Sequence, residues 1–89
     1  MNQITKRTTS GLVNEGRTEV ISVILTGGTD AATADVLDGT TSGGTSKLFI
    51  KAASTETKPV KLAEKGAIFS EGVYVTLTGT GPSVTVIWK

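Results

Sequence analysis

The sequence predicts an all-β fold: a single small antiparallel β-sandwich of six to seven strands, Ig-like or jelly-roll-like, with an extended N-terminal arm. Apolar and polar residues alternate along several segments, which is the two-residue period of a strand with one buried face. Most alternating residues are β-branched or aromatic, and these suit a pleated sheet better than a helix. Glycine-rich breakers recur roughly every eight to twelve residues, a spacing typical of sandwiches and small barrels.

Residues 1–17 show no sustained period. Their apolar residues after Met1 are Ile4, Leu12 and Val13, and the rest is polar or glycine. We interpret this region as an extended arm that is ordered by contact with something else, with a flexible terminus as the alternative. The predicted organisation is therefore an arm over residues 1–17 followed by a sandwich domain over residues 18–89.

Thr18 to Thr26 is predicted to be a strand with two largely apolar faces. One face carries Ile21, Val23 and Leu25, and the other carries Val20, Ser22 and Ile24. A strand with one face in water normally shows polar residues there, so we expect this strand to be central or to lie under a partner.

Ala31 to Leu37 has alanines that favour helix, but it also alternates and is bounded by turn signals, so we expect a strand. Asp38 to Thr45 is predicted to be a hairpin loop. Ser46 to Ala52 follows as a strand that turns Leu48 and Ile50 inward. Its outward residues are Lys47, Phe49 and Lys51.

The last third of the chain predicts one short strand, one short apolar piece and one hairpin. The short strand carries Val60 and Leu62 after Pro59 and ends at a turn over Glu64 to Gly66, and Ala67 to Phe69 is the apolar piece. In the final segment, Val73, Val75 and Leu77 alternate with polar or aromatic residues, and after Gly79 to Pro82 the alternation resumes with Val84, Val86 and Trp88. We predict that these two strands pair through a tight turn.

Composition excludes several kinds of chemistry. The 89 residues include no cysteine and no histidine, so a disulfide, a thiolate zinc site and histidine-dependent catalysis are excluded. A Ser46–Lys47 pair is a poor catalytic arrangement because neighbouring strand residues point to opposite faces. We therefore expect a protein that is not an enzyme and that has no catalytic residue and no cofactor.

Net charge and hydropathy limit the classes of partner that we expect for this chain. The formal net charge is +1, which gives no reason to expect nucleic acid. No apolar stretch is long enough to span a bilayer, and no signal peptide is visible, so no membrane partner is expected. Asp30, Asp35 and Asp38 match no calcium-loop spacing, and we interpret them as turn residues rather than metal ligands, although the metal interpretation stays open.

Apolar residues outside the predicted core are the candidate interaction surface. Val20, Ile24, Phe49, Tyr74 and Ile87 lie opposite the best inward rows, and Ile4, Leu12 and Val13 lie in the predicted arm. A contiguous patch of such residues marks an interface, whereas isolated ones do not. A domain of this size is marginally stable alone, so we expect it to form an oligomer.

Three segments resemble small virion proteins of tailed phages. They are Ala34 to Thr45 with Lys47-Leu-Phe, then Gly66 to Val75, then Thr76-Leu-Thr-Gly-Thr with Val84-Thr-Val-Ile-Trp. Proteins of that type have a strand that ends in Asp-Gly before a glycine-rich loop, then Gly-x-x-Phe-x-x-Gly-Val/Leu-Tyr-Val, a Thr-Gly-Thr turn and a valine-rich last strand. The resemblance covers about residues 18–89, and Leu37 stands where an aromatic residue is common.

The resemblance implies a non-enzymatic β-sandwich that decorates or cements the capsid shell. It implies a homo-oligomer, most often a trimer, that binds the major capsid protein on the virion surface after synthesis in the host cytoplasm. The arm would lie across a neighbouring subunit. Two alternatives remain: a head–tail joining or tail/fibre protein, and a carbohydrate-binding sandwich with an exposed aromatic platform at Trp88 or Tyr74.

Overall fold

The chain folds entirely as β-structure in residues 3–62 and 67–89, which are the residues that the computed structural model describes. These residues form nine strands, two or three more than the sequence predicted. The strands are β1 (Gln3–Arg7), β2 (Gly11–Glu15), β3 (Thr18–Thr26), β4 (Ala32–Asp38), β5 (Thr45–Ala52), β6 (Thr57–Lys61), β7 (Ala67–Phe69), β8 (Gly72–Thr78) and β9 (Ser83–Trp88).

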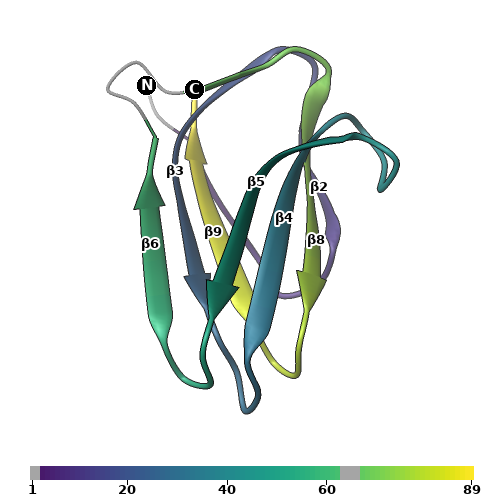
Figure 1. Cartoon of the computed structure of the whole chain (residues 1–89). Helices are drawn as coiled ribbons and strands as arrows, with labels where there is room; N and C mark the ends of the chain where they lie inside the picture. Colours follow the sequence, from purple (N-terminus) through teal and green to yellow (C-terminus); the bar gives the residue numbers. More distant parts are fainter. Residues whose placement is uncertain (1–2, 63–66) are drawn as a thin grey trace.

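Two antiparallel sheets pack face to face, as Figure 1 shows. Sheet A has the order β1-β9-β3-β6, with β7 also paired to β3, and sheet B has the order β2-β8-β4-β5. The prediction of an all-β antiparallel sandwich is confirmed.

The prediction of a separate N-terminal arm is wrong. All five residues of β1 pair with β9, from Gln3 opposite Trp88 to Arg7 opposite Val84. Strand β2 pairs with β8 in the other sheet. Residues that were expected to form an arm are therefore one edge strand of each sheet, and no domain boundary separates them from the sandwich. An edge strand buries little of its own surface, so it folds without the apolar period on which the prediction relied.

The predicted C-terminal hairpin is also wrong in its pairing, although both of its strands exist. Strand β8 belongs to sheet B and β9 belongs to sheet A, so residues 79–82 cross from one sheet to the other. Alternation shows that each strand has one buried face, but it does not say which strand lies beside it. Across the described residues, the hairpin between consecutive strands is β4–β5, which confirms the predicted loop after Asp38.

The core is aliphatic and lies between the two sheets. Its fully buried side chains include Val23, Leu25, Val36, Val73, Val75, Val84 and Val86, together with Phe69. The inward rows that were predicted for β8, β9 and β5 are confirmed, since Leu77, Trp88 and Leu48 also pack against this core.

Strand β3 departs from its predicted alternation at one point. Its register against β9 shifts between Val20 and Ser22, which is a β-bulge. Because of this extra residue, Val20 faces the same side as Val23 and Leu25 and is fully buried.

Strands β6 and β7 form where the sequence predicted a short strand and a short apolar piece, and one predicted turn is not described. Strand β6 contains Pro59 opposite Ile24, and Val60 opposite Val23 faces the core. Ala67 to Phe69 forms the short strand β7 on β3. The predicted turn over Glu64 to Gly66 lies outside the described residues.

Three sheet-crossing loops meet at one end of the sandwich, at the bottom of Figure 1. Gly28 lies between the other two loops: Thr55 N donates to Gly28 O at 3.0 Å, and Thr29 N donates to Thr80 O at 3.0 Å. A Cβ atom on Gly28 would overlap Thr80 O and would lie 2.6 Å from the carbonyl carbon of Gly81. Glycine is needed at position 28 for close backbone approach.

Candidate functional site

The outer face of sheet A gathers three of the candidate interface residues. Ile4 on β1 lies opposite Ile87 on β9, and Ile87 lies opposite Ser22 on β3. Ile24 is two residues along β3 from Ser22, so it is the diagonal neighbour of Ile87 on the same face. Ile4 is 69% exposed, and the other two are half-buried. We call Ile4, Ile24 and Ile87 the sheet A patch.

The outer face of sheet B carries a second apolar row. Leu12 on β2 lies opposite Tyr74 on β8, and Tyr74 lies opposite Leu37 on β4. Leu37 is only 5% exposed although it lies on the outer face, which shows how closely this row packs. We call Leu12, Leu37 and Tyr74 the sheet B row.

Phe49 is exposed on the same face and is a diagonal neighbour of Leu37 in the sheet B row, because Leu37 is two residues along β4 from Asp35. It lies opposite Asp35 and is 54% exposed. Lys51 Nζ lies 5.9 Å from the centre of its ring, a distance at which a cation interacts weakly with an exposed aromatic face. Phe49 therefore extends the sheet B row at an exposed position that is flanked by charge.

Two candidate interface residues are not on the surface. Val20 is fully buried in the core because of the bulge in β3. Val13 packs partly buried against the core, on the face of β2 opposite to Leu12. Both residues hold the sandwich together, and neither belongs to an outer surface.

Two residues of these surfaces escaped the sequence prediction. Leu37 lies on the face of β4 opposite to its core residues, where the other residues are polar. An apolar residue on that face was the sequence signal that could have predicted it. Ile68 is 41% exposed opposite Glu19, on a strand too short to show a period.

The two aromatic residues that were considered for a sugar platform, Trp88 and Tyr74, lie in different sheets. Trp88 packs against the core, and its Nε1 donates to Thr5 Oγ1 at 3.1 Å. Tyr74 lies within the sheet B row between Leu12 and Leu37. Trp88 and Tyr74 are therefore not gathered on one surface, and both are half-buried.

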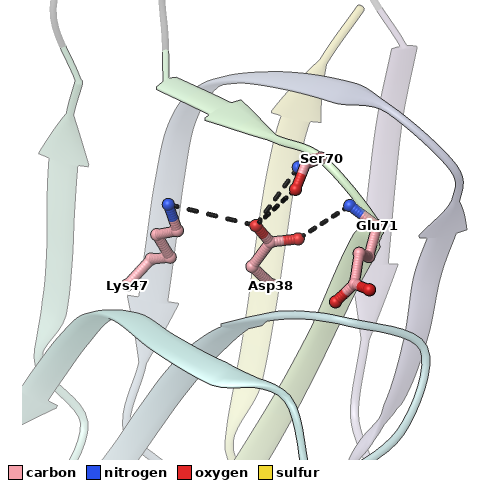
Figure 2. A network of polar contacts seen from close by, with 4 residues as sticks. All are labelled: Asp38, Lys47, Ser70 and Glu71. Atoms are coloured by element: carbon pink, nitrogen blue, oxygen red, sulfur yellow. Dashed lines mark hydrogen bonds and ion pairs between the residues drawn. The ribbon is translucent and has the colours of Figure 1, made fainter.

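Asp38 links the two sheets at the other end of the sandwich. Its carboxylate accepts hydrogen bonds from Glu71 N at 2.9 Å, from Ser70 N at 3.2 Å and from Ser70 Oγ at 3.2 Å, as Figure 2 shows. Residues 70 and 71 connect β7 of sheet A to β8 of sheet B. The carboxylate therefore fixes a sheet crossing, which agrees with the turn role that was predicted for this residue.

The same contacts lower the pKa of Asp38. The N–H of Glu71 is the largest cause, the two donors of Ser70 add to it, and burial opposes it. Lys47 Nζ, at 3.9 Å from Oδ2, contributes least of the favourable contacts because its side chain is 46% exposed. Asp38 is thus held as a carboxylate by fixed backbone donors, which suits a structural role.

An open depression of about 460 Å³ lies beside Asp38. The glycine-rich loop and Glu71 line it. The N–H groups of Gly39, Gly43 and Gly44 donate to Gly72 O, Thr41 Oγ1 and Thr41 O, so they are not directed at a ligand. The depression offers carbonyl and hydroxyl oxygens and one exposed carboxylate, without a buried polar group aimed into it.

The three aspartates do not come together. Asp30 accepts a hydrogen bond from Thr80 Oγ1 at 3.1 Å, Asp35 accepts one from Ser46 Oγ, and Asp38 caps the sheet crossing. Across residues 3–62 and 67–89, no three acidic residues are grouped so as to hold a metal ion. The same residues contain no helix with the length and apolarity of a membrane crossing.

The fold and these surfaces define a small, nine-stranded antiparallel sandwich with apolar residues on both outer faces. Comparison with known proteins adds no family to this description. No protein-family model matches the chain, and no curated protein matches it.

Proposed function

We propose that this chain is a non-enzymatic structural protein of a tailed-phage virion. It decorates the capsid shell by contact with copies of itself and with the major capsid protein. The resemblance of residues 18–89 to such proteins supports this proposal, and so does the sandwich fold, on which the resembling segments occupy strands and turns.

The sheet A patch is the observation that carries the proposal. Ile4, Ile24 and Ile87 come from three neighbouring strands and form one apolar surface that faces solvent. Burying apolar surface contributes about 25 cal/mol per Å², so a shell protein that covers this patch gains affinity without needing a charged or catalytic site. Isolated exposed residues would not support this argument, but neighbours across strands do.

The sandwich itself supplies the attachment surface in this proposal. Ile4 and Leu12, which were expected on a separate arm, lie on the outer faces of sheets A and B. The protein therefore attaches as a rigid module, and its N-terminal residues contribute as edge strands.

Shell binding by matched variants tests the proposal. Shells of the virion that carries this chain, stripped of it, are incubated with purified protein, and bound copies are counted after sedimentation. We expect Ile24→Lys to weaken binding at least tenfold because it places a charge in the sheet A patch. Thr76→Lys is the control, since it adds the same charge to the polar part of the outer face of sheet B. Both variants are first checked for wild-type unfolding midpoints.

Copy number in purified particles separates the positions in the virion. Hundreds of copies per particle indicate the shell, whereas about a dozen indicate the neck or tail. Wild-type protein that does not bind shells, or Ile24→Lys that binds as well as wild type, contradicts the proposal.

A further inference from the structure

Asp38 is followed directly by Gly39, and an Asp-Gly pair is chemically labile in a flexible chain. The backbone nitrogen of the second residue can attack the side-chain carboxyl of the first, and glycine hinders this attack least because it has no Cβ atom. The other two aspartates of the chain, at positions 30 and 35, precede an alanine and a valine, whose side chains hinder the same attack. Asp38 is therefore the aspartate whose neighbour favours this reaction most.

The reaction at such a pair releases one water molecule and later takes one up. Gly39 N forms a bond to Cγ of Asp38, and the carboxyl hydroxyl leaves as water together with the N–H proton, which gives a five-membered succinimide ring. Water then opens the ring at one of its two carbonyl carbons. Opening at the carbonyl carbon of the original main chain leaves isoaspartate, in which the main chain runs through Cγ and the free carboxylate is attached to Cα.

The fold holds the carboxyl of Asp38 away from this reaction. Its oxygens accept from Glu71 N at 2.9 Å and from Ser70 N and Ser70 Oγ at 3.2 Å, which fixes the side chain against the crossing from β7 to β8 (Figure 2). These donors favour the charged form of the group. A carboxylate reacts poorly with a nitrogen nucleophile, because it would have to expel an oxide ion instead of water.

The attacking nitrogen is held as well. Gly39 N donates to Gly72 O at 3.2 Å, and Gly39 is buried. Asp38 is the last residue of β4 and lies opposite Thr45 on β5 and Val73 on β8. The backbone rotation that brings the nitrogen towards Cγ would break the ends of both strand pairings. Ring closure therefore requires that this end of the sandwich opens first.

The packing needs both residues of the labile pair. The carboxylate of Asp38 fixes the crossing from β7 to β8. A Cβ atom on Gly39 would lie 2.9 Å from the Cα atom of Gly44, which is too close for two backbone-fixed carbon atoms. The glycine that makes the pair labile is thus the residue that lets the two ends of the loop approach each other.

We propose that Asp38–Gly39 is the site at which this chain forms isoaspartate, and that the reaction proceeds when the crossing from β7 to β8 opens. The rate in the folded protein is then the rate in the open chain multiplied by the fraction of molecules that are open at this end. The inference is independent of the virion role, because it concerns contacts within one chain and its test uses no shell.

The modification acts in one direction. Isoaspartate lengthens the main chain by one carbon atom and moves the carboxylate from the end of the side chain to Cα. The donors of Ser70 and Glu71 then lose the acceptor that the folded chain gives them. A modified chain should therefore unfold at a lower concentration of denaturant than an unmodified chain.

Isoaspartate content over time, measured by mass spectrometry of protease digests, tests the inference. Samples of the full chain are kept in mildly acidic buffer, one set folded and the other unfolded in guanidinium chloride. In the unfolded set, isoaspartate should appear at position 38 before it appears at positions 30 and 35. In the folded set, the rate at position 38 should be at least tenfold lower.

Two matched variants test whether the crossing controls the rate. Ser70→Ala removes the Oγ donor of Asp38 and should raise the rate in folded protein about threefold or more, without changing the rate in unfolded protein. Thr80→Ala is the control, because it removes the hydroxyl donor of Asp30 at the other end of the sandwich, and it should leave the rate at position 38 unchanged.

Four results would each overturn the inference. They are isoaspartate at positions 30 or 35 as early as at position 38 in unfolded protein, equal rates at position 38 in folded and unfolded protein, a rate for folded Ser70→Ala no higher than that for Thr80→Ala, and a modified chain that unfolds at the wild-type midpoint.

Discussion

Replacing Gly28 by alanine tests the packing of the sheet-crossing loops. Its added Cβ would overlap the carbonyl oxygen of Thr80, and both backbones are fixed. Thr80 O accepts from Thr29 N at 3.0 Å, and Gly28 O accepts from Thr55 N at 3.0 Å. The methyl group fits only if one loop moves away from another and weakens these hydrogen bonds.

The expected cost is about 2–4 kcal/mol of unfolding free energy. Overpacking contributes about 1–3 kcal/mol, and one weakened hydrogen bond contributes about 1 kcal/mol. A chain of 89 residues is stable by about 4–13 kcal/mol, so the substitution removes a large part of the total.

Gly43→Ala is the matched control. The nearest atom to a Cβ at Gly43 is Thr41 Oγ1 at 3.6 Å, an ordinary van der Waals contact. Alanine restricts the unfolded chain more than glycine does, so this change should be neutral or should stabilise by up to about 1 kcal/mol.

Urea unfolding followed by the fluorescence of Trp88, the one tryptophan of the chain, measures both changes. We expect a clearly lower midpoint for Gly28→Ala and an unchanged or higher midpoint for Gly43→Ala. If Gly28→Ala stays within 1 kcal/mol of wild type, the close approach of these loops is not what requires glycine.

Three further predictions follow from the fold. Phe69→Ala should lower the unfolding free energy by about 3–5 kcal/mol in the same urea assay, because Phe69 is 1% exposed in the core. The pKa of Asp38 is lower in the folded than in the unfolded chain, so its stabilising contribution is present above about pH 4 and is lost as pH falls through the folded value. Asp38→Asn should therefore make the unfolding free energy less dependent on pH below about 4. Deleting residues 1–10 removes β1 and leaves β9 as an open edge, so circular dichroism and light scattering should show destabilised, aggregating protein.

Each of these predictions has its own control or contrary result. Phe49→Ala is the partner for Phe69→Ala and should change stability far less, because Phe49 is 54% exposed. Asp38→Asn with the same pH dependence as wild type would show that the Ser70 and Glu71 donors do not set the acid response. A shortened chain that unfolds at the wild-type midpoint would restore the hypothesis of a separate arm.

Several features of the fold follow from local sequence patterns. The valines of β8 and β9 alternate without interruption, and both strands bury them as predicted. Asp38 and Gly39 end β4 as expected, because turn chemistry acts over a few neighbouring residues. The outward positions of Ile24, Phe49 and Ile87 were predicted correctly for the same reason, since strand faces alternate.

Predictions of which residues face the surface were wrong where a single extra residue changes the face of a strand. The bulge in β3 turned Val20 into the core, and Val13 faces the core because β2 pairs in sheet B with Leu12 outward. Local sequence contains little signal for a bulge, because the bulge arises when a strand adapts to its partner. The candidate surface therefore lost two residues and gained Leu37 only once the sheets were known.

Alternation and glycine-rich turns are local properties, so the amino-acid sequence predicts an all-β sandwich, most of the strands after residue 17 and the buried side of most of those strands. Only the tertiary structure decided that β8 and β9 lie in different sheets, that residues 3–7 and 11–15 are edge strands, and that Ile4 adjoins Ile87. Strand partners are chosen by backbone hydrogen bonds between segments far apart in the chain. All residue types except proline can make those bonds, so the bonds alone do not specify the partner.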